Sequence, residues 1–321
     1  MKFLASSALP SSLSPPPVDD QLARRRLELN APKTEDDSTV RALASFLDFL
    51  PNEGRHPLSQ FVSGCSNATL YSLAEYLISS ILIPIRTRAI TPEFSPSPFE
   101  DNGAQVQEEA SSMDQPPTRN KQKQLKQQCL DRDDHRCMAT GISDVKADGI
   151  GTVRLGFTAH TVLAHIIPYS IGTSEDKKTD HKVAQMWATV KRLFPRIELG
   201  LILLPEIRNA FDRFGIAFEP IENNHEYQNL TLGPEFLTIF TLYLPPPTDH
   251  GYRLVTFQAH TNTPLPSPAI LQAHATLANI LHASGIGEHI ENIMREFEET
   301  RYLAPDGSDD IYRLISIRLR A

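Results

Sequence analysis

The chain has 321 residues, of which 40% are hydrophobic and 22% are charged, and these proportions exclude a wholly disordered or fibrous protein. The net charge of -8 argues against a protein whose whole surface binds nucleic acid, because phosphate binding depends on clustered Lys and Arg. The three cysteines are widely spaced and predict neither a disulfide framework nor a thiolate zinc site, which favours a reducing compartment. We therefore expect an intracellular protein of the cytoplasm or nucleus. No membrane partner is expected, because the longest apolar run, 78–85, is too short to span a bilayer.

A polar arm followed by helices is predicted for the first 90 residues. Residues 1–35 are rich in Ser and Pro and then in charged residues, which predicts a flexible, disordered arm. From Ser38, which together with Thr39 can cap a helix, apolar residues recur at helical spacing, and a second such stretch covers 68–83. These two stretches predict an N-terminal helical region over 36–90.

Residues 91–120 combine Pro, Ser and acidic residues with few apolar ones, and they predict a linker. The segment that follows is the most basic stretch of the chain and predicts a helix that runs into a turn at Gly141. A solvated helix face is the simpler interpretation of such a run, and contact with phosphates is the alternative. The candidate nucleic-acid-binding residues are Lys121, Lys123, Lys126, Arg132 and Arg136.

Strands and helices are predicted to alternate through the centre of the chain. β-Branched residues and short apolar runs favour strands, and apolar residues at helical spacing favour helices. The predicted order is strand, helix, strand, helix and strand, over 153–167, 180–194, 197–204, 205–214 and 215–221. Two amphipathic stretches separated by Gly285 then predict a pair of helices within a C-terminal region over 241–321.

Four motifs follow one another in the second half of the chain. They are RDDHRCMATG, LAHIIPYSIG, RNAFDRFGIAFEP and LPSPAILQAHATLANILHASGIGE, which begin at Arg132, Leu163, Arg208 and Leu265. In this order they resemble the motifs of the fungal HNH-endonuclease-like family. The resemblance implies an α+β fold with a ββα-metal, HNH-like core and flanking N- and C-terminal helices. We expect the HNH-like domain over 121–240 and the C-terminal helical region packed on it.

The same resemblance implies three site residues for metal-dependent phosphodiester cleavage. A histidine acts as general base on the attacking water, an asparagine orients that histidine, and a second histidine on the helix binds Mg²⁺ or a similar divalent cation. His165 matches the general base. Leu199 matches the asparagine and cannot form the orienting hydrogen bond, while Arg208 matches the second histidine and repels a cation. The candidate catalytic residues are therefore His165 and Arg208, with no metal ligands predicted.

Three interpretations of the function follow. The first is a nuclease or former nuclease whose basic helix meets nucleic-acid phosphates, with Mg²⁺ as cofactor if cleavage survives. The second is a small-molecule enzyme of a fungal secondary-metabolite pathway. Its cleft, lined by Leu199, Leu201 and Leu203 with His165 and Arg208, would serve proton transfer, isomerisation or cyclisation of an organic substrate. The third is a non-catalytic interaction protein that uses the N-terminal arm and helices.

Overall fold

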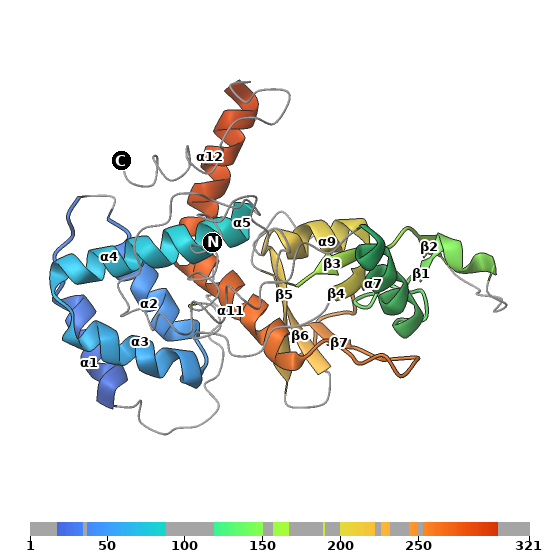
Figure 1. Cartoon of the computed structure of the whole chain (residues 1–321), viewed down its shortest axis with the longest axis horizontal. Helices are drawn as coiled ribbons and strands as arrows, with labels where there is room; N and C mark the ends of the chain where they lie inside the picture. The colour runs from blue at the N-terminus through green and yellow to red at the C-terminus, as the bar shows by residue number, and fades with distance from the viewer. Residues whose placement is uncertain are drawn as a thin grey trace.

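The structure is a computed structural model in which helices and strands gather into two lobes (Figure 1). It describes residues 18–34, 37–87, 119–149, 157–166, 189, 200–221, 226–231, 244–249 and 253–300. Mixed helix and strand confirm the α+β class. The predicted linker and the helix over 180–194 fall almost wholly outside the described residues.

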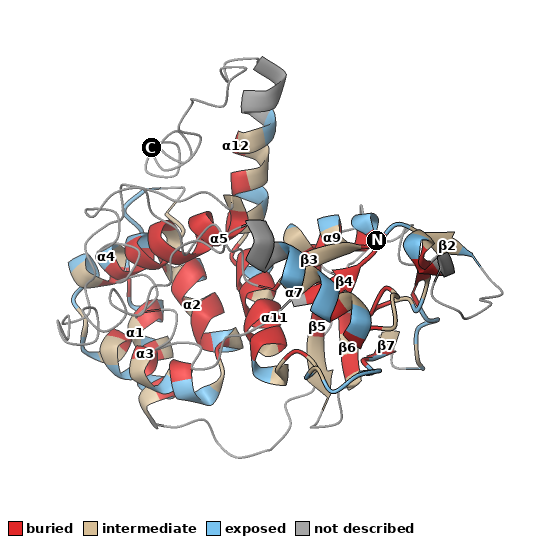
Figure 2. Cartoon of the chain, turned by 45° about the vertical axis from the view of Figure 1, so that its right-hand side comes forward, coloured by how far each residue is buried: buried red, intermediate tan, exposed pale blue. Residues whose placement is uncertain are grey.

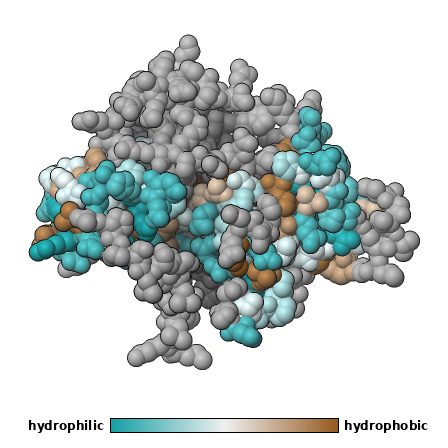
Figure 3. All heavy atoms as spheres, turned by 90° about the horizontal axis from the view of Figure 1, so that it is seen from below, coloured by the Kyte–Doolittle hydropathy of each residue, from teal (hydrophilic) through white to brown (hydrophobic). Residues whose placement is uncertain are grey.

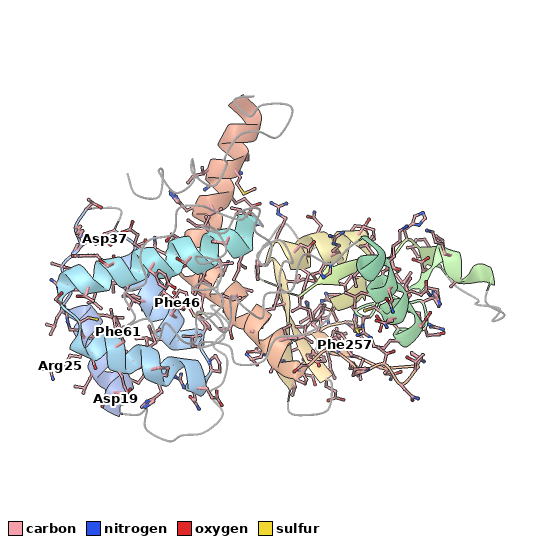
Figure 4. The ribbon with its side chains drawn as sticks, viewed as in Figure 1. Asp19, Arg25, Asp37, Phe46, Phe61 and Phe257 are labelled. Carbon is pink, nitrogen blue, oxygen red and sulfur yellow. The ribbon has the colours of Figure 1, made fainter. Side chains whose placement is uncertain are left out.

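The helical lobe is formed by the N-terminal helices together with the two C-terminal ones. Its elements are α1 (Val18–Glu28), α2 (Thr39–Phe49), α3 (Asn52–Gly64), α4 (Asn67–Leu77), the π-helical turn η1 (Ile78–Leu82), α5 (Ile83–Thr87), α11 (Pro268–Ala283) and α12 (Ile286–Thr300). Leucines and isoleucines form most of its core, many of them from α2, α4, η1 and α11, and Phe46 lies among them (Figures 2 and 4).

The helical lobe begins earlier in the chain than the composition indicates. The prediction of a flexible arm over 1–35 is wrong for Val18–Glu28, which form α1 and pack against α3. Ala23 and Leu27 lie one helical turn apart and are buried, so this charged helix still has an apolar stripe. The cap of α2 also differs from the prediction, because Asp37 Oδ1 rather than Ser38 accepts the hydrogen bond from the Thr39 amide, at 2.8 Å.

One helical stretch of this lobe is long and apolar enough to cross a membrane. Asn67–Thr87 spans 21 residues, more than the apolar run visible in the sequence, and its most apolar window has a mean hydropathy of 1.4. However, 67% of its most apolar window is buried inside the protein, as in the core helix of a folded lobe. Its apolar surface is therefore used in packing.

In the β lobe, the described residues form three small sheets and two helices. Its elements are α7 (Arg119–Arg132), β1 (Ser143–Asp144), the 3₁₀ turn η2 (Val145–Gly149), β2 (Thr158–Ala159), β3 (Val162–His165), β4 (Gly200–Leu203), α9 (Pro205–Asp212), β5 (Ile216–Ile221), β6 (Glu226–Thr231) and β7 (Arg253–Thr256). β1 pairs with β2 in parallel, β3 pairs with β4 antiparallel, and β5, β6 and β7 form an antiparallel sheet in that order. Phe257 lies beside this last sheet (Figure 4).

The predicted boundary at residue 240 does not separate two units. β7 lies beyond it, in the region predicted to be helical, and pairs with β6. α11 packs against both β5 and α2, so the C-terminal region contacts the helical lobe as well as the β lobe. Residues at the start of α11, Ile270 and Leu271, belong to the core of the β lobe, and its later residues belong to the other core.

His274 marks the point on α11 where the two cores meet. Its imidazole is 2% exposed and stacks on Phe211, with ring centroids 3.8 Å apart, and on Phe214, at 4.5 Å. Its Nε2 lies 3.1 Å from the Phe211 carbonyl oxygen. Phe214 itself has a φ of +57°, which ends α9 and turns the chain into β5. This histidine packs the central helix against α9 and is part of the scaffold.

Candidate functional site

The first of the four motifs forms a compact turn between α7 and β1, here called the motif turn (residues 132–144). Arg132 and Asp133 form a bidentate ion pair inside it, with Nε–Oδ1 at 2.6 Å and Nη2–Oδ2 at 3.0 Å. Both side chains are buried, at 0% and 2% exposed. Burial raises the pKa of the Asp133 carboxyl, although hydrogen bonds from Arg132 and from the Ile202 amide lower it. The pair therefore joins the motif turn to the edge of β4.

Cys137, Thr140 and Gly141 complete the motif turn. The Cys137 amide donates to the Ile142 carbonyl at 2.8 Å, and its Sγ accepts a hydrogen bond from the Leu204 amide at 3.3 Å. Burial raises the pKa of the Cys137 thiol, so the sulfur stays protonated and neutral at pH 7. Gly141 has a φ of +71°, which a residue with a side chain rarely adopts. These motif residues build the turn that supports the strands.

Arg132 is thus not a nucleic-acid-binding residue in this structure, and that prediction is corrected. Its guanidinium is fully buried because Asp133 binds it. Arg136 is 43% exposed but pairs with Asp134 at 3.2 Å, and its charge is partly neutralised. Lys123 is exposed and Lys126 is half-buried. The Lys121 side chain lies outside the described residues, so the basic helix offers phosphates fewer free cations than its sequence indicates.

A second buried carboxylate connects the motif turn to β3. Asp144 Oδ2 accepts hydrogen bonds from the Thr161 amide at 2.7 Å and from the Thr161 hydroxyl at 2.5 Å. Its Oδ1 accepts from the Lys146 amide at 2.7 Å. Burial opposes ionisation of Asp144, but these hydrogen bonds outweigh it and hold the pKa of the carboxyl below its ordinary value. Thr161 immediately precedes β3, so this contact fixes where the strand begins.

His165 is the last residue of β3 and lies opposite Gly200 of β4. Ala164, one residue earlier, is 0% exposed and lies opposite Leu201 in the same core as α9. Because side chains alternate along a strand, His165 projects from the other face of the pair, where it is half-buried. His160, in the turn before β3, is exposed.

Helix α9 follows β4 directly and packs against β3. Pro205 occupies its first position, where the missing amide costs no hydrogen bond. Ile207, Ala210 and Phe211 face the core. Arg208 lies on the flank of the helix, and its Nε is 3.0 Å from Asp212 Oδ2, one turn later. The helix-surface ion pair that this spacing permits is therefore present.

The elements that carry His165 and Arg208, β3 and α9, are in contact. Among the described residues, the side-chain polar partner of Arg208 is Asp212. The apolar cleft predicted for a small-molecule substrate is not found as described, because Leu201 and Leu203 are both 0% exposed and belong to the core. Leu199, the third residue of that wall, lies outside the described residues.

The residues at this position do not fit a divalent cation. The side chain that the resemblance places as a helix ligand is the permanently charged guanidinium of Arg208, and the nearest carboxylate, Asp212, is already bound by it. Within the described part of the chain, no group of three or more His, Cys, Asp and Glu side chains converges to hold a metal.

Sequence reasoning missed the two carboxylates that organise this region, Asp133 and Asp144. The sequence offers a pattern that could have identified Asp133, because an arginine directly precedes it in the motif. It offers no such pattern for Asp144, since its partner Thr161 lies 17 residues away. Comparison of the chain with family models, with curated proteins and with solved structures gives no match. A function for this chain therefore has to be inferred from its own residues and their geometry.

Proposed function

We propose that this protein is a divergent HNH-endonuclease-like protein that has been diverted from metal-dependent phosphodiester cleavage. The observation that carries the proposal is the Arg208–Asp212 ion pair, with Nε and Oδ2 3.0 Å apart, at the helix position where the family motif has a metal-binding histidine. A guanidinium there repels a divalent cation and also occupies the neighbouring carboxylate. The proposed site keeps the histidine of a general base and has exchanged the metal for a fixed organic cation.

The order and packing of three elements support the relation to the HNH family. β3 and β4 are antiparallel, α9 begins two residues after β4, and α9 packs against β3. His165 lies on the first strand and Arg208 on the helix, in the order that the motifs predict. The motif turn braces the outer edge of β4, since the Met138 amide donates to the Ile202 carbonyl at 2.8 Å. A scaffold of this kind can remain folded after metal-dependent cleavage is lost, because the contacts that support its strands do not involve a metal ion.

The small-molecule interpretation has less support from the described residues. It requires an apolar wall beside His165, and two of the three leucines proposed for that wall are core residues. A nucleic-acid partner, if bound through the basic helix, would meet Lys123 and Lys126 and not Arg132. The acidic net charge of -8 makes such contact local and sensitive to salt.

The experiment that tests the proposal is a plasmid-nicking assay with Mg²⁺ or Mn²⁺, with and without EDTA, beside calorimetric titration of each metal. We expect no metal binding and no EDTA-sensitive nicking by the wild-type protein. His165→Ala reports on the proposed general base, and His160→Ala is its matched control, because that histidine is exposed and lies five residues earlier. EDTA-sensitive nicking that is lost in His165→Ala and kept in His160→Ala would show that the cleavage chemistry survives.

A gain-of-function variant tests the same geometry from the opposite side. Arg208→His combined with Leu199→Asn restores the residue types of the family motif. If β3, β4 and α9 have the proposed relation to that motif, this double variant binds Zn²⁺ or Mn²⁺ and loses the binding when His165→Ala is added. Arg213→His with Leu199→Asn places the histidine beyond the end of α9 and serves as the control. Equal metal binding by the two double variants would argue against the motif assignment.

A further inference from the structure

One glutamate joins three elements where the two lobes meet. Glu291 of α12 accepts a hydrogen bond on Oε2 from Arg86 Nη2 of α5, at 2.6 Å. Its Oε1 pairs with Nη2 of Arg213, the residue that caps the C-terminal end of α9. Each carboxylate oxygen is thus bound by a different guanidinium, and the two arginines come from different lobes.

The burial of the three side chains is uneven. Arg86 is 7% exposed, whereas Glu291 is 32% exposed and Arg213 is 42% exposed. A buried guanidinium needs an anion beside it, because an uncompensated buried charge is strongly destabilising. Solvent reaches this carboxylate, so a dissolved anion can approach the same two arginines from outside.

Helix α12 holds Glu291 in place through a narrow apolar stripe. Ile286, Ile290 and Ile293 are buried in the core of the helical lobe, and they lie in the first half of the helix. Beyond them α12 projects away from the body of the molecule (Figures 1 and 2). On the face seen in Figure 3, the described surface is mainly hydrophilic with small separated apolar areas.

We propose that Arg86 and Arg213 form a binding site for a phosphate-class oxyanion, and that Glu291 occupies this site in the present conformation. Two guanidinium groups that each bind one oxygen of the same anion suit a phosphate as well as a carboxylate. An external phosphate group displaces Glu291, replaces its charge beside Arg86 and loosens α12. Anion binding and the pairing of Glu291 with these two arginines are therefore mutually exclusive. This inference does not depend on the proposed function.

The first test is calorimetric titration of inorganic pyrophosphate into the full-length Glu291→Gln protein. Glu291→Gln keeps the shape of the side chain and removes the competing charge, so pyrophosphate should bind roughly tenfold or more tightly than to the wild type. Glu288→Gln is the control, since it removes one negative charge from an exposed position of the same helix. Adding Arg213→Ala to Glu291→Gln should abolish the gain. Equal affinities for Glu291→Gln and Glu288→Gln would overturn the proposal.

A second test uses the wild-type protein and does not depend on the folding of a variant. Amide hydrogen exchange is measured in α12 with inorganic pyrophosphate and, separately, with a short single-stranded oligonucleotide that carries only diester phosphates. Faster exchange in α12, with unchanged exchange in α2, supports the proposal. A response to pyrophosphate alone assigns the site to free phosphate-type anions, and a response to both assigns it to the phosphate group wherever it is carried. No response of α12 to either compound contradicts displacement of Glu291.

Discussion

The two lobes of this protein are stabilised in different ways. The core of the helical lobe is mostly aliphatic, with fully buried leucines such as Leu43, Leu47 and Leu70 on helices of 11 residues or more. The β lobe has strands of two to six residues, and aromatic rings such as Phe218 and Phe257 pack between them. In the β lobe, buried polar side chains also hold the backbone.

This difference follows from how much apolar surface each kind of element buries. A helix of three turns presents a continuous apolar stripe, so its position is fixed by packing with little need for directional bonds. Strands as short as β1 and β2 bury little, and their register depends on side chains that bond to specific amides. The Asp133 and Asp144 carboxylates supply those bonds at the edge of β4 and at the start of β3. We expect such contacts to specify a conformation more than they stabilise it.

The largest expected effect comes from breaking the buried ion pair of the β lobe. Arg132→Ala leaves the Asp133 carboxylate buried without its guanidinium, and should lower the free energy of unfolding by about 3–5 kcal/mol. Arg136→Ala removes a half-exposed arginine from the same turn and should cost less than about 1 kcal/mol. Urea unfolding followed by circular dichroism measures both.

Replacing both charges with apolar residues asks whether the β lobe can be stabilised like the helical one. Arg132→Met with Asp133→Leu removes both buried charges at once, so it should cost less than Arg132→Ala alone. If the double replacement is the more destabilising, the hydrogen bond from the Ile202 amide to Asp133 matters more than the charge pair. In that case the polar contact stabilises the lobe directly.

Acid should weaken the β lobe through Asp144. Hydrogen bonds outweigh burial and hold the pKa of this carboxyl below the ordinary value of 3.8. The stabilisation is therefore complete above that value and is lost as the pH falls through the lower, folded-state pKa. Asp144→Asn should reduce the free energy of unfolding by about 1.5 kcal/mol at pH 7, and the difference from wild type should shrink below pH ~4. A difference that stays constant between pH 7 and pH 2 would contradict this role.

Local patterns predicted most of the helices and the elements of the candidate site. α2, α4, α11 and α12 have apolar residues at helical spacing, and the order of β3, β4, α9 and β5 follows from apolar runs and one proline. α1 was missed because its composition is dominated by charged residues. Only its packing against α3 shows that Ala23 and Leu27 are buried. β6 forms a local hairpin with β5 but was missed because its sequence, EYQNLT, contains no apolar run. β7 was missed because its pairing with β6 is non-local.

Some of the contacts that organise both sites are also non-local. Arg86 and Glu291 lie 205 residues apart, and the Arg132 guanidinium reaches the Pro264 carbonyl across 132 residues. No rule of sequence spacing connects such residues. The sequence alone therefore predicts that an arginine in a basic helix, such as Arg132, is exposed. The Arg208–Asp212 pair is the opposite case, since residues four apart on one helix form a local pattern that spacing alone can predict.

The smallest expected effect is the coupling energy of this same Arg208–Asp212 pair. Arg208 is 38% exposed, so a double-mutant cycle with Arg208→Ala and Asp212→Ala should give a coupling energy of about 0.5 kcal/mol from urea unfolding. A coupling of about 3 kcal/mol would instead place the pair among the buried contacts of the β lobe. With weak coupling, the scaffold does not require an arginine at the position of the motif histidine. Weak coupling would therefore agree with the proposal that Arg208 serves the site and not the stability of the fold.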